Sequence, residues 1–133
     1  MIESTELTTG AELVATRTVT ESDIARCAKL TGDFGAHHVS GLAGRPIAQG
    51  LLTAAVAPLL RGDVGFQLRS MSMKFLAPVF AGDTVTATVR ITGVGPATGG
   101  PVEFGLELAI ANQDATPVIT GTGTGLFADP TRN

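Results

Sequence analysis

Two kinds of hydrophobic periodicity divide the chain. After residue 61, apolar and polar residues alternate at every second position, in runs at 70–75, 84–92 and 102–110. An alternation of period two is typical of antiparallel strands covered on one face. A fourth run at 118–127 also alternates, but threonine and glycine replace most of its large side chains. Turn-forming residues separate the runs, so this part of the chain predicts an antiparallel sheet.

The preceding part of the chain predicts one strand and two helices. Residues 13–19 are expected to form the first strand. Thr20 and Asp23 have the spacing of a capping box at the start of a helix, and Gly32 is expected to end that helix. Residues 47–60 are apolar on nearly every side, which predicts a second helix that is buried all round.

The last predicted strand indicates how the sheet and the second helix meet. Three alternate glycines share one face of the run at 118–127. A strand with so few side chains is weak unless another element approaches it closely. The alanine-rich helix at 47–60 suits that approach, and Pro58 is expected to end or kink it. We therefore expect an α+β fold, in which a long antiparallel sheet wraps around a central buried helix.

Length and composition narrow the class of protein. The 133 residues suit a single domain covering 1–133, with residues 1–12 loosely ordered. A chain that is 44% hydrophobic and 16% charged is not disordered. A net charge of −3 argues against nucleic acid and against a membrane surface as partners. The acidic N-terminus does not resemble a signal peptide, so a cytoplasmic protein is expected.

The residues that bind metals or form disulfides are few. Cys27 is the single cysteine, which rules out an internal disulfide. Its helical register with apolar neighbours favours core packing over a role as nucleophile. The two histidines are adjacent, and no Cys/His cluster accompanies them, so neither a metal site nor a cofactor is expected.

One pair of residues suggests chemistry. Asp33 and His38 lie in the glycine-rich loop between the two predicted helices. A carboxylate and an imidazole together can manage a water molecule and a proton, which is the minimum for adding or removing water across a double bond. The backbone N–H of Gly50, near the start of the second helix, would polarise a thioester carbonyl. The alternative is that Asp33 caps a turn after Gly32 and that both histidines lie on the surface.

Three segments carry a family resemblance. They are Leu30–Phe34 followed by His38, then Arg45–Ala54, then Lys74–Asp83. In this order they resemble the MaoC-like, or R-specific enoyl-CoA hydratase, family of hot-dog-fold proteins. The resemblance extends over residues 19–127.

The resemblance implies a function as well as a fold. It implies a homodimer of hot-dog domains that acts on acyl thioesters of coenzyme A or of an acyl carrier protein. By position, Asp33 and His38 match the catalytic pair of the family, which adds water to an α,β double bond or removes it. Gly50 matches the glycine whose N–H polarises the thioester oxygen.

The sequence departs from the family pattern around this pair. Gly35 and Ala36 stand where the family has Asn and Pro, and His37 offers a second imidazole. Gln49 stands where the family usually has His, and the stretch between His38 and Pro46 is shorter than usual. Such a remodelled pocket would fit a specialised tailoring dehydratase that acts on an unusual or bulky acyl group.

Two other functions remain open from the sequence. One is a hot-dog acyl thioesterase, in which Asp33 activates water against the carbonyl. The other is a non-catalytic acyl-binding accessory subunit. Four basic residues are candidate contacts for a coenzyme A or carrier phosphate, although ordinary solvated charges explain each of them: Arg45, Arg61, Arg69 and Lys74.

Overall fold

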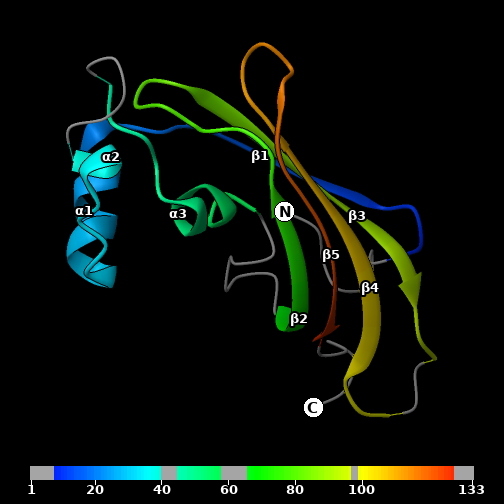
Figure 1. The fold of residues 1–133 in the computed structure, drawn as a ribbon. Coiled ribbons are helices and arrows are strands. Elements are labelled where there is room, and N and C mark those ends of the chain that lie inside the picture. Colours follow the sequence, from blue (N-terminus) through cyan, green and yellow to red (C-terminus); the bar gives the residue numbers. More distant parts are fainter. Residues whose placement is uncertain (1–7, 40–44, 58–65, 97–98, 128–133) are drawn as a thin grey trace.

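The computed structural model describes residues 8–39, 45–57, 66–96 and 99–127 (Figure 1). The expectation for Pro58, the last residues of the predicted second helix and most of the N-terminal segment lie outside these ranges. Arg61 also lies outside them.

Five antiparallel strands form one sheet in the order β1-β3-β4-β5-β2. The strands are β1 (Glu12–Thr18), β2 (Phe66–Phe75), β3 (Thr84–Val94), β4 (Val102–Ala111) and β5 (Pro117–Phe127). All five predicted strands are therefore confirmed, with β1 and β2 at the two edges of the sheet.

Three helices lie between β1 and β2 in the chain: α1 (Glu21–Thr31), α2 (Ala36–Val39) and α3 (Gly50–Ala54). Figure 1 shows α1 and α2 side by side at one end of the molecule, with α3 between them and the sheet. Ala54 and Ala57 belong to the same buried cluster as the strands. The α+β class and the sheet that curves around a central helix are confirmed.

The predicted start and end of α1 are confirmed. The Thr20 hydroxyl accepts a hydrogen bond from the Asp23 N–H at 3.0 Å, and the Asp23 carboxylate accepts one from the Thr20 N–H at 3.1 Å. Gly32 ends the helix at φ 76°, where it donates its N–H to the Ala28 carbonyl. This left-handed backbone favours glycine because a Cβ atom would be strained there.

The period-two pattern divides the two faces of the sheet as expected. The inward residues of β3 and β4 are almost fully buried: Val85, Ala87, Val89, Ile91, Phe104, Leu106, Leu108 and Ile110. The threonines between them in β3 face the opposite side, which no described helix covers.

The expected helix over 47–60 is wrong in its start and in its burial. Ile47 and Ala48 are extended, because Ala48 donates its N–H to the Val79 carbonyl and Ile47 bridges to Phe80. These bonds to the loop after β2 replace the first helical turn, so α3 begins only at Gly50. Within α3, Leu51 is 65% exposed, so the helix is not buried all round.

The expectation that glycines of β5 admit the central helix is also wrong. A Cβ atom on Gly121 or Gly123 would lie 2.6 Å from a carbonyl oxygen of the neighbouring strand β2. The next atoms that it would meet belong to Met71 and Met73, which are also in β2. These glycines therefore accommodate the edge strand rather than α3.

Candidate functional site

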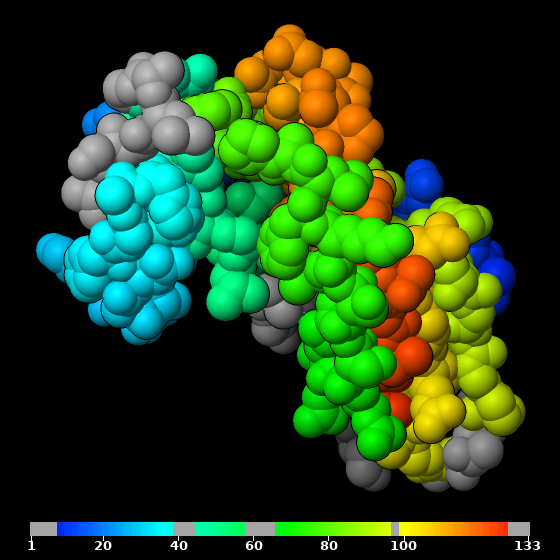
Figure 2. Space-filling model, viewed as in Figure 1, coloured from blue at the N-terminus to red at the C-terminus, as the bar shows by residue number. Residues whose placement is uncertain are grey.

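A cavity of about 800 Å³ opens between the helices and the end of β2. Figure 2 shows this hollow between the cyan atoms of α1 and α2 and the green atoms of β2. Apolar side chains such as Leu51, Phe75 and Ile119 form much of its wall. Asp33, His37 and His38 contribute to the wall on the side of α2. An apolar pocket with a few polar groups is the usual form of a small-molecule site.

His38 is held from within the protein. Its side chain is only 7% exposed, and its Nδ1 atom lies 2.6 Å from the carbonyl oxygen of Ile47. A carbonyl oxygen can only accept a hydrogen bond, so Nδ1 carries a proton. In the neutral ring the second nitrogen, Nε2, then holds the lone pair, and a proton on Nε2 would be hydrogen-bonded by the Asp33 carboxylate that faces it.

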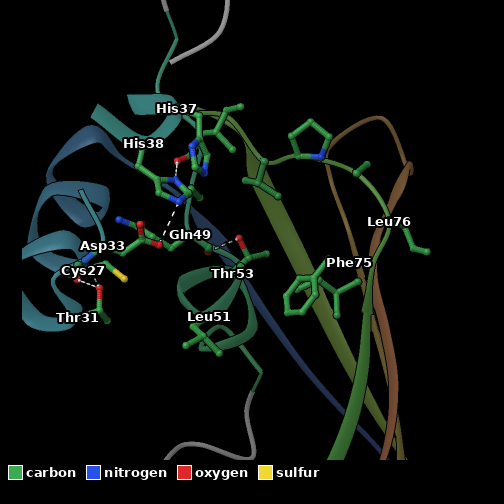
Figure 3. A pocket seen from close by; sticks show the side chains of 17 residues that line it. Cys27, Thr31, Asp33, His37, His38, Gln49, Leu51, Thr53, Phe75 and Leu76 are labelled. Carbon is green, nitrogen blue, oxygen red and sulfur yellow. Dashed lines mark hydrogen bonds and ion pairs between the residues drawn. The ribbon is translucent and has the colours of Figure 1, made fainter. Parts of the chain in front are cut away.

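Asp33 faces that second nitrogen. Its Oδ2 atom lies 3.3 Å from His38 Nε2, and its side chain is 50% exposed (Figure 3). The other carboxylate oxygen accepts the N–H of Gly35 at 3.3 Å, and the Asp33 N–H bonds to the Thr31 hydroxyl at 3.2 Å. Asp33 therefore caps a turn after Gly32, as the alternative interpretation of the sequence expected. It also faces the imidazole of His38.

His37 occupies a different position. It is exposed, and its ring centroid lies 3.7 Å from that of His38. Of the two imidazoles, His38 is the one paired with Asp33 and with a backbone carbonyl. The histidine that lies beside Asp33 is thus the one that the family resemblance indicated, and His37 is not.

Gly35 and Ala36 stand where the family has Asn and Pro, and here the single turn of α2 closes the loop. The His38 N–H donates to the Gly35 carbonyl at 2.9 Å. A Cβ atom on Gly35 would lie 2.8 Å from the His37 ring, so the absence of a side chain there makes room for that ring.

The opposite wall of the cavity holds Gly50 and Phe75. Gly50 is the first residue of α3, and the first N–H groups of a helix have no partner within it. The ring of Phe75 lies against Gly50, where an added Cβ atom would be 2.7 Å away. Phe75 has no polar group, and the alternating pattern of its strand does not distinguish an apolar residue of a pocket from one of the core. The sequence therefore did not identify it as part of the site.

Gln49 also lines the cavity, although it is only 3% exposed. Its Nε2 group donates to the Ile24 carbonyl of α1 at 3.1 Å, which fixes the orientation of the amide. The Oε1 atom is buried without a hydrogen-bond partner among the described residues. Gln49 thus connects α1 to the start of α3 but leaves one acceptor unsatisfied.

Two sequence interpretations change here. Cys27 is only half-buried and lines the cavity, so it does not fill the core. Arg45 is not a freely solvated charge, because its guanidinium contacts the Ala81 carbonyl at 3.0 Å and Asp83 at 3.4 Å. Arg69 and Lys74 are exposed on β2.

The described residues contain no helix long and apolar enough to cross a membrane. Within the same ranges, no three His, Cys, Asp or Glu side chains gather as a metal site would require.

Comparison with known proteins identifies the family. The family model described as MaoC like domain matches residues 4–104. An (R)-specific enoyl-CoA hydratase of Rhodospirillum rubrum is 35% identical in an alignment 91 residues long, which covers 60% of this chain and 62% of that protein. The match therefore spans less than two thirds of the relative.

Solved structures agree on the fold. A monoamine oxidase regulatory protein from Archaeoglobus fulgidus is 27% identical, with a TM-score of 0.79 over 96% of this chain and 95% of that chain. The (R)-hydratase from A. caviae involved in PHA biosynthesis is 27% identical, with a TM-score of 0.77 over 92% of this chain and 98% of that chain. With the family model covering most of its length and the sheet wrapped on α3, this chain belongs to the MaoC-like family of hot-dog-fold proteins.

Proposed function

We propose that this protein is a hydratase or dehydratase that acts on the α,β double bond of acyl thioesters, with Asp33 and His38 as its acid/base pair. One observation carries the proposal. His38 commits Nδ1 to the Ile47 carbonyl and presents Nε2 to the Asp33 carboxylate at 3.3 Å, beside a largely apolar cavity. The similarity to an (R)-specific enoyl-CoA hydratase supports the same class of substrate.

The geometry accounts for the proton transfers in the reaction. In hydration, His38 Nε2 takes one proton from a water molecule held beside Asp33, and the hydroxyl adds to the β-carbon. The pair then returns a proton to the α-carbon, so that it ends in its initial protonation state. In dehydration the same steps run in reverse.

The opposite wall would hold the thioester. The Gly50 N–H, at the start of α3, would donate to the thioester oxygen and stabilise the negative charge that develops there. The apolar wall near Phe75 and Leu51 would contact the acyl chain. An acyl chain of a coenzyme A or carrier-protein thioester would occupy this cavity. The departures from the family pattern at Gly35, Ala36 and Gln49, which lie around the cavity, favour a specialised tailoring dehydratase.

A second copy of the chain is proposed as the partner. Strand β2 is at the edge of the sheet, where no other described strand pairs with its outer side, and it exposes Leu68 and Phe75. Leu51 and Leu76 are exposed nearby at the cavity. An exposed strand edge with apolar side chains tends to pair with another chain, and a second copy in a homodimer would cover it.

Crotonyl-CoA provides the direct test of the proposed function. Loss of the enone absorbance without release of free thiol is the expected result. We expect Asp33→Asn and His38→Gln each to reduce turnover by about two orders of magnitude or more, because each removes one half of the proton transfer. Circular dichroism checks that both variants remain folded.

His37→Gln is the matched control, since its exposed ring lies beside the pair but does not contact Asp33 in the described contacts. It should retain most of the turnover. Thiol release by the native protein would instead indicate a thioesterase. Acyl-thioester binding that survives an Asp33/His38 double substitution, with no turnover in the native protein, would indicate an accessory subunit.

A further inference from the structure

We propose that Asp83, which lies outside the cavity, is a positioning residue that sets the tautomer of His38 through the backbone of Ile47. The inference rests on the proposed function for its kinetic consequence, but its structural consequence is independent of that function. Asp83 is 6% exposed and does not line the cavity.

The first link is the segment that carries the Ile47 carbonyl. Residues on both sides of Ile47 are tied to the turn at 79–83. The Ala81 N–H donates to the Pro46 carbonyl at 2.9 Å, and the Ala48 N–H donates to the Val79 carbonyl at 2.7 Å. The position of the carbonyl that faces His38 Nδ1 therefore follows the position of this turn.

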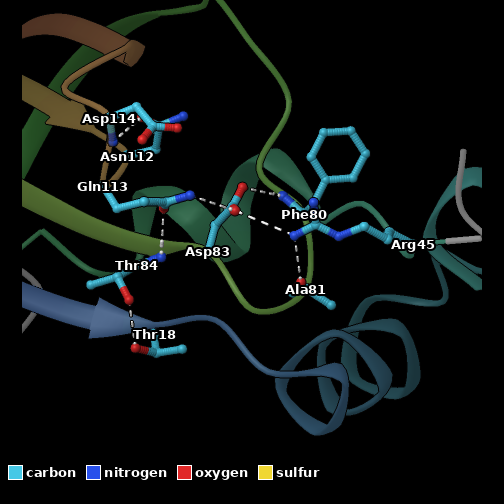
Figure 4. Close-up of polar contacts among 9 residues, drawn as sticks. All are labelled: Thr18, Arg45, Phe80, Ala81, Asp83, Thr84, Asn112, Gln113 and Asp114. Atoms are coloured by element: carbon cyan, nitrogen blue, oxygen red, sulfur yellow. Dashed lines mark hydrogen bonds and ion pairs between the residues drawn. The ribbon is translucent and has the colours of Figure 1, made fainter. Parts of the chain in front are cut away.

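The second link is the carboxylate that shapes the turn (Figure 4). Asp83 Oδ2 accepts the Phe80 N–H at 2.9 Å, while Oδ1 accepts from Gln113 Nε2 at 3.0 Å. The Arg45 guanidinium lies 3.4 Å from Oδ1. Three donors thus converge on one buried carboxylate, and hydrogen bonds to a charged group are among the stronger ones in proteins.

The third link joins the turn back to the active-site segment. The Arg45 guanidinium also donates to the Ala81 carbonyl at 3.0 Å and lies 5.0 Å above the ring of Phe80. Arg45 immediately precedes the segment that contains Ile47, so one side chain fastens that segment to the turn and to Asp83. The backbone N–H of Val19 adds a bond to the Asp83 carbonyl at 2.9 Å.

An amide cannot replace this carboxylate. In D83N the side chain would offer one acceptor oxygen, and its NH2 group would face donors from Gln113, Phe80 or Arg45. Gln113 cannot rotate to compensate, because its Oε1 atom accepts the Thr84 N–H at 3.0 Å. The turn would then shift, the Ile47 carbonyl would move from Nδ1, and the proton of His38 would no longer be confined to that nitrogen.

The test is nitrogen NMR of the imidazoles in protein labelled at histidine, combined with crotonyl-CoA kinetics. In the native protein we expect neutral His38 to carry its proton on Nδ1, and His37→Gln assigns the signals. In D83N we expect that signal to shift toward the Nε2-protonated form. We also expect kcat to fall about 10²-fold, as for a misplacement of about 1 Å, with KM changed less than kcat.

Arg90→Gln is the matched control. It removes a 2.9 Å ion pair with Glu107 on β3 and β4, and neither residue lines the cavity. It should leave both the tautomer and kcat unchanged. If D83N does not fold, Arg45→Met carries the test, because that side chain is 53% exposed and its loss leaves the Phe80 and Gln113 bonds to Asp83 in place.

Arg45→Met should shift the tautomer in the same direction, by less than D83N. A folded D83N with an unchanged tautomer overturns the proposal, even if its melting temperature falls, because Asp83 would then only stabilise the fold. An unchanged tautomer in Arg45→Met, where D83N is unfolded, also overturns it. Absence of hydratase activity in the native protein removes only the proposed function, since the NMR result still decides the role of Asp83.

Discussion

At the scale of single residues, the role of a side chain in the site depends on which of its atoms already have a hydrogen-bond partner. His38 differs from its neighbour His37 because a backbone carbonyl engages its Nδ1 atom and a carboxylate faces its Nε2 atom. Gln49 shows the same principle, because its amide nitrogen is engaged by Ile24 and its oxygen is left without a partner among the described residues. Hydrogen-bond partners therefore distinguish side chains of the same residue type.

Gln49 leads to a prediction about stability. Gln49→Met removes an unsatisfied buried acceptor together with the bond to Ile24, so the two effects nearly cancel. We expect the free energy of unfolding to change by no more than about 1 kcal/mol. Gln49→Glu places a carboxylate where the amide is 3% exposed and is expected to cost about 3–5 kcal/mol at neutral pH.

Urea unfolding of the two variants and the native protein measures both values. A loss of more than about 3 kcal/mol in Gln49→Met would contradict the prediction, since it would mean that Oε1 has a strong partner in the folded protein.

At the scale of elements, hydrogen bonds at its N-terminus stabilise helix α1, and the sequence indicated those between Thr20 and Asp23. Thr20 and Asp23 exchange hydrogen bonds, and Arg17 at the end of β1 donates to the Asp23 carboxylate at 2.7 Å. The bond from Arg17, followed by the bond from the Thr20 N–H, holds the pKa of Asp23 below its ordinary value of 3.8. The ionised carboxylate therefore contributes to folding stability.

We expect Asp23→Ala to lower the free energy of unfolding, and the loss to depend on pH. A lowered pKa in the folded state means that the stabilisation is fully present above pH 3.8 and is lost as the pH falls through the folded-state value. Thr20→Ala removes the other half of the box at a cost of about 1 kcal/mol.

Denaturant unfolding of Asp23→Ala at a series of pH values checks the dependence. Its difference from the native protein should shrink as the solution becomes more acidic than pH 3.8. Ser22→Ala, in the same turn, is the control and should change stability little. A constant difference across the series would show that the charge of Asp23 does not contribute.

The glycines of the sheet lead to a second prediction at this scale. Gly123→Ala would bring a Cβ atom to 2.6 Å from the Ser70 carbonyl oxygen, and a backbone atom cannot move aside cheaply. We expect a loss of about 1–3 kcal/mol, as for other overpacked sites.

Gly93→Ala in β3 is the matched control, because nothing lies within 4 Å of its added Cβ atom. It should be neutral or stabilising by up to about 1 kcal/mol, since alanine loses less chain entropy on folding. Thermal unfolding of both variants measures the contrast. Equal effects would mean that β2 does not lie as close to β5 as the structure places it.

At the scale of the whole molecule, the two edges of the sheet differ in their surroundings. Phe75, at the end of edge strand β2, is exposed beside the apolar residues at the cavity, and Leu68 is exposed farther along the same strand. Val14 is exposed on edge strand β1. Leu68 is 39% exposed and Val14 is 57% exposed, so exposure alone does not decide which edge pairs with another copy. Leu51, Phe75 and Leu76 are exposed together at the cavity beside the end of β2, and this apolar surface favours that edge.

Leu68→Asp should therefore shift the proposed homodimer toward the monomer, because the carboxylate would be buried at the new strand pair. Val14→Asp should leave the dimer intact. Light scattering after size-exclusion chromatography, over a range of protein concentrations, measures both masses. Dissociation by Val14→Asp alone would assign the interface to β1 instead.

The secondary structure and the sheet could be predicted from the sequence because their signals are local. Alternation of period two, the Thr20–Asp23 spacing and Gly32 each specify a neighbouring stretch of backbone. The extent of α3 could not be predicted in this way, because bonds from Ile47 and Ala48 to the loop after β2 replaced its first turn. Tertiary hydrogen bonds overrode the helical pattern there.

The candidate pair, Asp33 and His38, was also found from the sequence, because both residues lie on one short loop. By itself, the sequence determined the five strands, the capped first helix and the two residue types that face each other in the cavity. Only the tertiary structure decided which nitrogen of His38 faces the carboxylate, which backbone carbonyl its other nitrogen contacts and what lies over the glycines of β5. The physical reason is that these features depend on backbone carbonyls and neighbouring strands that only folding brings together. Every residue has a backbone carbonyl, so the residue types do not indicate which carbonyl will contact a given side chain.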